Sequence, residues 1–112
     1  MLAFNLKYLQ TVRRVNSRPR PEAARRVRVS GRVQGVYFRA STATRANELS
    51  LCGYAENRAD GTVLVLAAGE TAALAELVDW LQQGPPMARV ESVEVESIEP
   101  ASLDWPAGFH AR

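Results

Sequence analysis

The sequence has very few residues of the kinds that bind metals or form cross-links. Its 112 residues include one cysteine, Cys52, and one histidine, His110. One cysteine cannot form a disulfide within the chain, and these two residues cannot supply the usual ligands of a zinc site. We therefore predict a domain that holds no metal and no cofactor. A single thiol is typical of a reducing compartment, so we expect a cytoplasmic protein.

Long apolar runs are also missing, and no segment approaches the ~20 residues needed to cross a membrane. Acidic residues are scarce in one part of the chain only. Residues 1–24 carry Glu22 against five basic side chains, Lys7, Arg13, Arg14, Arg18 and Arg20. Because the whole chain has a net charge of +2, the remainder is slightly acidic. An acidic body argues against a nucleic-acid-binding surface.

The basic segment 1–24 is predicted to be a flexible extension. Pro19 and Pro21 interrupt any helix before the alternating pattern that follows. The length leaves room for one compact domain, which we place at residues 25–112.

Hydrophobic spacing in this domain alternates between the strand and the helix period. The apolar stripe of the second helix is followed by Gly84, and Thr71 is a candidate cap at its start. Asp60–Gly61 is a hairpin signal. A change of phase between Val95 and Ile98 predicts a bulge or a strand end. The predicted elements are strands at 26–30, 52–57, 62–68 and 90–98, helices at 39–51 and 71–83, and a short strand around Phe109.

This order predicts an α+β fold, a ferredoxin-like βαββαβ sandwich. The sheet is expected to be antiparallel with four to five strands, and both helices are expected on one face. Many functions share the fold, so function has to come from a site.

The segment from Gly31 to Arg39 joins the first strand to the first helix. Its glycines, Gly31 and Gly35, allow sharp turns and close approach to a ligand. Successive backbone N–H groups and the positive end of the following helix favour an anion there. Arg39 adds a guanidinium fork that suits phosphate oxygens.

Three blocks in this order resemble the acylphosphatase family. The first is Gly31-x-Val-Gln-Gly-Val-x-Phe-Arg39, the second runs from Gly53-Tyr-Ala-x-Asn57 through Asp60-Gly61, and the third is Gly84-Pro-Pro-x-Ala-Arg-Val90. The resemblance covers residues 25–112. One departure is Ser50, where the family usually has a glycine at the helix end.

The resemblance implies a metal-independent hydrolase that cleaves the carboxyl–phosphate anhydride of small acyl phosphates and releases inorganic phosphate. By similarity Arg39 and Asn57 are catalytic, with Arg39 gripping the phosphate and Asn57 orienting water. The phosphate cradle is assigned to the loop residues Gln34, Gly35, Val36, Tyr37, Phe38 and Arg39. The side chains of Tyr37 and Phe38 are expected to pack rather than to contact substrate.

Hydrolysis of an acyl phosphate suits a chain that has few candidates for a general acid or base. An acyl phosphate releases a carboxylate, a weak base that needs no general acid. Phosphoryl transfer to water then depends mainly on positioning and charge stabilisation. Arginine and backbone amides can supply the charge stabilisation without a metal. One asparagine amide can position a water, because it both donates and accepts hydrogen bonds.

Several functions besides hydrolysis remain open from the residues. An RNA-binding module has the same element order but stacks bases on strand aromatics, and Thr62–Leu66 contains none. The residues are also compatible with an anion sensor, a domain for another carboxyl phosphate within a larger enzyme, and an interaction domain without activity. We expect a monomer whose partner is a small acyl phosphate, with no nucleic-acid or membrane partner.

Overall fold

The computed structural model of the protein describes residues 20–112. Most of the predicted extension, residues 1–19, lies outside them, whereas Ala23 and Ala24 already belong to the first strand. The elements in chain order are β1 (Ala23–Arg32), α2 (Phe38–Glu48), β2 (Cys52–Asn57), β3 (Val63–Gly69), α3 (Thr71–Leu81), β4 (Arg89–Ile98), a 3₁₀ turn (Pro100–Ser102) and β5 (Phe109–Ala111).

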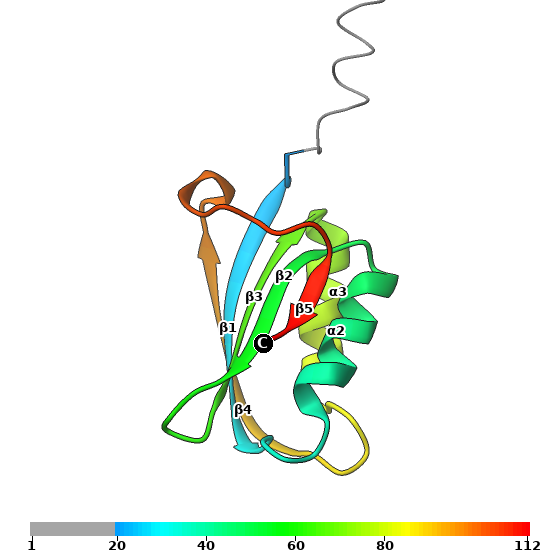
Figure 1. The fold of residues 1–112 in the computed structure, drawn as a ribbon, viewed down its shortest axis with the longest axis vertical. Helices are drawn as coiled ribbons and strands as arrows, with labels where there is room; N and C mark the ends of the chain where they lie inside the picture. The colour runs from blue at the N-terminus through cyan, green and yellow to red at the C-terminus, as the bar shows by residue number, and fades with distance from the viewer. Residues whose placement is uncertain (1–19) are drawn as a thin grey trace, which may run out of the picture.

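The five strands form one sheet in the order β4-β1-β3-β2-β5. Figure 1 shows α2 and α3 on the same face of this sheet. The predicted ferredoxin-like α+β fold is therefore confirmed. The sheet is mixed rather than wholly antiparallel, because β5 runs parallel to β2.

Alternation in β1 divides its side chains between the two faces of the sheet. Val27 and Val29 are fully buried beneath the helices. Arg26 and Arg28 point to the other face, where each faces a glutamate of β4 at 4.0 and 3.4 Å. These pairs are more than half exposed and add little stability. Burial of the valines is what holds β1 in register, since a one-residue slip would expose them.

The start of α3 differs from the sequence prediction. Thr71 is the first helical residue rather than the cap, and the N-cap Glu70 makes no side-chain hydrogen bond to the helix. The carboxylate of Glu22, just before β1, accepts the Thr71 N–H at 3.2 Å and its hydroxyl at 2.8 Å. These two bonds lower the pKa of Glu22, the hydroxyl contributing most.

The strand end predicted near Ile98 is confirmed, since β4 ends at that residue, whereas the irregularity in its register lies elsewhere. The register shift is between Ser30 and Gly31 of β1, opposite Ser92 and Val90. Ile98 pairs with Ala24 in regular register and shares its face of the sheet. The phase change near Ile98 thus reflects a strand buried on opposite faces at its two ends, not a bulge.

The C-terminal end of α2 is closed by a Schellman motif. The Ser50 N–H donates to the Asn47 carbonyl and the Leu51 N–H to the Ala46 carbonyl, at 3.0 and 2.9 Å. Ser50 has φ 60°, in the left-handed region that the motif requires. A side chain with a Cβ is disfavoured there, and glycine is not.

Ser50→Gly is therefore expected to raise the free energy of unfolding by about 0.5–1 kcal/mol, measured by urea denaturation. Thr44→Gly is the matched control, because Thr44 is exposed in the interior of the same helix. This control is expected to lower stability. A loss of stability in Ser50→Gly would contradict the strain argument.

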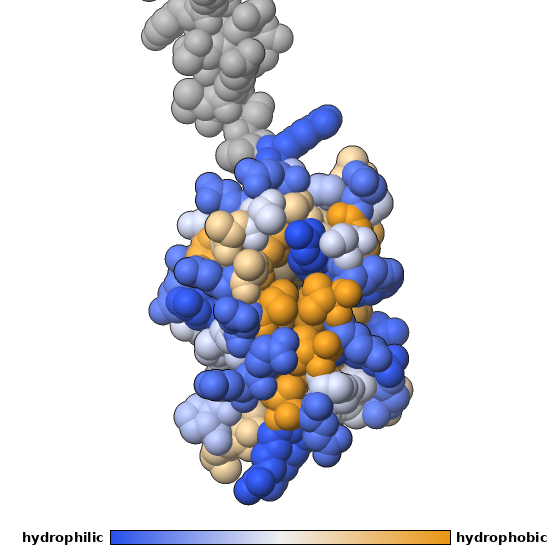
Figure 2. Space-filling view, turned by 180° about the vertical axis from the view of Figure 1, so that it is seen from behind, coloured by the Kyte–Doolittle hydropathy of each residue, from blue (hydrophilic) through white to orange (hydrophobic). Residues whose placement is uncertain are grey.

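The core is covered least where α3 faces the edge strand β4. Val78, Val90 and Val93 are partly buried against the core, and Val95 is 46% exposed. Figure 2 shows a patch of hydrophobic residues open to solvent on the side of the molecule that Figure 1 hides. Among residues 20–112, no helix is long and apolar enough to span a membrane.

Candidate functional site

The loop between β1 and α2 and the hairpin between β2 and β3 lie at the same end of the sheet (Figure 1). A cleft of about 400 Å³ opens there. Its lining brings together Arg39 and Asn57, which come from different elements. The lining residues are Val33, Gly35, Tyr37, Phe38, Arg39, Ala40, Asn57 and Ala111. A larger hollow of about 700 Å³ contains none of the predicted site residues.

The N-terminus of α2 points backbone donors into this region. Tyr37 is the N-cap residue and provides no side-chain cap. The first N–H groups of a helix have no intrahelical partner, so those of Phe38, Arg39 and Ala40 are available to a ligand. Gly35 and Tyr37 both have left-handed backbones, with φ 74° and 62°. Such alternating conformations form concave anion-binding nests.

Arg39 stands in the first turn of α2, next to those donors. Its Nη1 donates to the backbone carbonyl of Arg112, which follows β5. The Arg112 N–H in turn donates to the Ala55 carbonyl of β2 at 2.8 Å. The segment after β5 therefore holds the guanidinium at the cleft. The sequence pattern did not reveal this contact, because a backbone acceptor leaves no trace in residue type.

Asn57 is the last residue of β2 and is exposed. Its backbone pairs with Val63, so the strand ladder holds its position. Within residues 20–112 its side-chain amide makes no hydrogen bond to another residue. The carbonyl and NH₂ groups are both free to bind a small molecule in the cleft.

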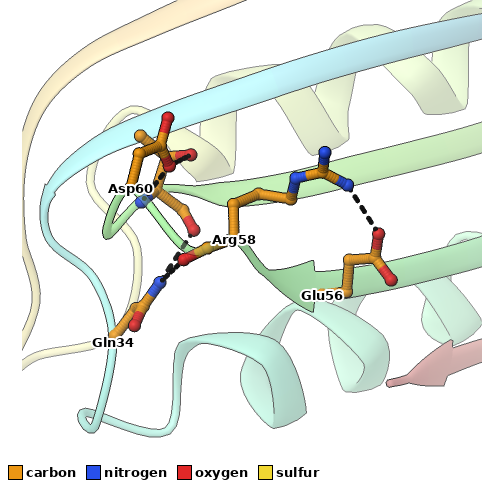
Figure 3. A network of polar contacts seen from close by, with 5 residues as sticks. Gln34, Glu56, Arg58 and Asp60 are labelled. Atoms are coloured by element: carbon orange, nitrogen blue, oxygen red, sulfur yellow. Dashed lines mark hydrogen bonds and ion pairs between the residues drawn. The ribbon is translucent and has the colours of Figure 1, made fainter.

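Gln34 serves the loop rather than the cleft. Its Nε2 donates to the carbonyls of Arg58 and Thr62, both at 2.9 Å (Figure 3). These acceptors belong to the β2–β3 hairpin, which carries Asn57 at its edge. The side chain thus ties the loop between β1 and α2, which leads to Arg39, to the hairpin that carries Asn57.

The hairpin is braced at its tip by Asp60. The Asp60 carboxylate accepts the Thr62 hydroxyl at 2.6 Å and the Thr62 N–H at 3.1 Å. These bonds, the hydroxyl first, lower the pKa of Asp60 below its ordinary value. Arg58 pairs with Glu56 at 3.0 Å along the strand edge (Figure 3). Both Arg58 and Asp60 are thereby engaged in the hairpin.

The three apolar side chains of the loop lie in different surroundings. Val36 and Phe38 are buried in the core, and the Phe38 ring lies 6.1 Å from that of Trp80. Tyr37 is 79% exposed, so the expectation that its side chain packs is wrong. With Gly35 it meets the cleft, whereas Val36 and Gln34 contribute to the loop from outside the lining.

A protein metal site usually needs several acidic, histidine or cysteine side chains close together. Residues 20–112 contain no cluster of three or more such side chains that could hold a metal ion.

Comparison with known proteins points to one family. The family model for acylphosphatase matches residues 25–110. An acylphosphatase of Rubrobacter xylanophilus is 57% identical over 87 residues, which are 78% of this chain and 77% of that protein. An acylphosphatase structure from Coxiella burnetii superposes with a TM-score of 0.75 at 39% identity, covering 82% of this chain and 94% of that one. The crystal structure of the acylphosphatase from Bacillus subtilis superposes with a TM-score of 0.75 at 34% identity, covering 80% of this chain and 98% of that one.

Proposed function

The chain belongs to the acylphosphatase family, hydrolases that act on acyl phosphates, and we propose that it works through the cleft between α2 and β2. The observation that carries the proposal is the meeting of Arg39, beside an uncapped helix N-terminus, with Asn57 in that cleft. We assign the phosphate to the backbone donors and Arg39, and the attacking water to Asn57.

In the proposed reaction the water oxygen bonds to phosphorus while the bond from phosphorus to the acyl oxygen breaks. The acyl oxygen keeps the electron pair and leaves as a carboxylate, which needs no protonation. Charge on the equatorial phosphate oxygens is stabilised by the guanidinium and the N–H groups. A phosphate oxygen takes the proton from the water.

Asn57 suits the water-binding role because its amide has both kinds of hydrogen-bonding group on one rigid plane. The carbonyl accepts a water hydrogen, and the NH₂ can donate to the water oxygen. The β2–β3 ladder holds the residue, so the water is positioned without ordering a flexible loop.

The direct test is hydrolysis of benzoyl phosphate by the full chain, with no added metal and with a chelator present. We expect turnover that the chelator does not change, since the proposed groups are all from the protein. A folded protein that binds inorganic phosphate without turnover would instead support an anion-binding domain. Turnover that the chelator abolishes would contradict the metal-independent mechanism.

Gln34→Ala tests the positioning of the two halves of the cleft. Losing both hairpin contacts lets the loop and Asn57 drift apart, so we expect kcat/KM to fall roughly 10- to 100-fold. The fold should persist with a cost of about 1 kcal/mol. Gln82→Ala is the matched control, because Gln82 is an exposed glutamine just after α3. Its kcat/KM is expected to be unchanged. Equal activity of the two variants would remove Gln34 from the site.

Location in the cytoplasm and a monomeric state stay predictions. The thiol of Cys52 is partly buried, which is compatible with the reducing compartment that we propose. Gel filtration of the full chain would test the oligomeric state.

A further inference from the structure

We propose that Tyr37 determines acyl-group specificity, presenting its ring to aromatic acyl groups while the phosphate occupies the loop. This inference rests on the proposed function. It concerns the part of the substrate that the phosphate-binding groups do not contact.

The Tyr37 ring has no role in the core. It is 79% exposed, whereas the next residue, Phe38, is 1% exposed and packs near Trp80. Two adjacent aromatic residues thus have opposite environments. A single exposed apolar side chain is common on protein surfaces, so the exposure shows only that core packing does not account for the ring.

The backbone at this position does not favour a tyrosine. Tyr37 has φ 62° and ψ 23°, and it gives the helix no side-chain cap. Glycine adopts this conformation without strain, and a bulky residue does not. Neither packing, capping nor backbone geometry therefore accounts for the side chain, and strain of this kind is typical of functional sites.

The position of Tyr37 in the cleft offers a reason for a tyrosine at this place. Tyr37 lines the same space as Arg39 and Asn57. Phe38 is buried, and the remaining neutral lining residues are small or aliphatic: Val33, Gly35, Ala40 and Ala111. Tyr37 is thus the lining residue that offers solvent-accessible aromatic surface. An aromatic acyl group can stack on it in an offset or edge-to-face geometry, and an acetyl group cannot.

The experiment compares kcat/KM for benzoyl phosphate and acetyl phosphate in wild type, Tyr37→Gly and Tyr37→Phe. For Tyr37→Gly we expect a loss of roughly 3- to 10-fold with benzoyl phosphate. This loss is measured relative to acetyl phosphate, because the Tyr37 backbone belongs to the phosphate-binding loop and a change in that loop would lower turnover of both substrates alike. Tyr37→Phe keeps the ring and should retain the wild-type ratio of kcat/KM for benzoyl phosphate to that for acetyl phosphate. Leu103→Gly, at an exposed residue outside the cleft lining, is the control.

An unchanged ratio of the two kcat/KM values in Tyr37→Gly would overturn the proposal. If both values fell equally, the role of Tyr37 would be structural. Binding of benzoylphosphonate and acetylphosphonate by calorimetry separates this result from failure of the proposed function. If neither acyl phosphate is hydrolysed but Tyr37→Gly still weakens benzoylphosphonate alone, the contact stands and the hydrolase assignment falls. If the benzoyl preference is absent from binding as well, the proposal is wrong.

Discussion

Asn57→Ala is expected to lower kcat for benzoyl phosphate by about 100- to 1000-fold, the usual effect of removing one preorganised polar group. The side chain is exposed and makes no hydrogen bond to residues 20–112, so the fold should keep its stability. Affinity for inorganic phosphate should change little, because the loop and Arg39 are untouched. Steady-state kinetics, product inhibition and thermal unfolding of the same preparation measure all three.

The neighbouring Arg58→Ala is the matched control for Asn57→Ala. Arg58 is exposed on the same hairpin, and its guanidinium pairs with Glu56 rather than facing the cleft. This variant should retain most of its kcat. A normal kcat in Asn57→Ala would remove Asn57 from the mechanism, and a fall in phosphate affinity would make it a phosphate ligand instead.

Arg39→Ala is expected to have the largest effect. Its kcat/KM should fall at least about 1000-fold, and inorganic phosphate should no longer inhibit it. In the mechanism that we propose, the fork supplies charge and two donors to the phosphate in both the ground and the transition state, so KM should rise and kcat should fall. Arg39→Lys keeps the charge but not the planar fork and should recover only part of the activity.

Arg39 also bonds the carbonyl of Arg112, so stability has to be followed alongside activity. Arg45→Ala is the comparison on the same helix, because Arg45 pairs with Glu48 on the exposed surface, away from the cleft. Its kcat/KM should be near wild type. An Arg39→Ala protein that is folded and still inhibited by phosphate would contradict the assignment of Arg39 as the phosphate ligand.

Elements with a strong periodic pattern were predictable from the sequence. The run 52–57 matches β2 at both ends, and the predicted apolar stripe from Leu74 to Leu81 lies within α3, because apolar spacing reports the face that is buried. The β5 strand was indicated only weakly, since three residues are too short to show a period. Besides its ladder with β2, β5 is held by Asn47, whose amide NH₂ donates to the Phe109 carbonyl at 3.0 Å and whose oxygen accepts the Phe109 N–H at 2.9 Å.

The features that the sequence did not reveal are contacts between distant segments. Glu22 caps α3 from 49 positions away, and Gln34 reaches carbonyls 24 and 28 positions along the chain. Local propensity carries no information on such partners. For the site, the motif supplied Arg39 and Asn57, but motif position alone did not distinguish the buried Phe38 from the exposed Tyr37.

The bond from Arg39 to Arg112 joins residues 73 positions apart through a strand of only three residues. Closing so long a loop costs conformational entropy, and a strand of three residues has few contacts to offset that cost. A molecule in which β5 has detached can retain the other four strands and both helices. Circular dichroism would record it as nearly native, while the guanidinium would have lost its anchor. Given the role that we propose for Arg39, recovery of activity during refolding is therefore expected to report the docking of the final strand.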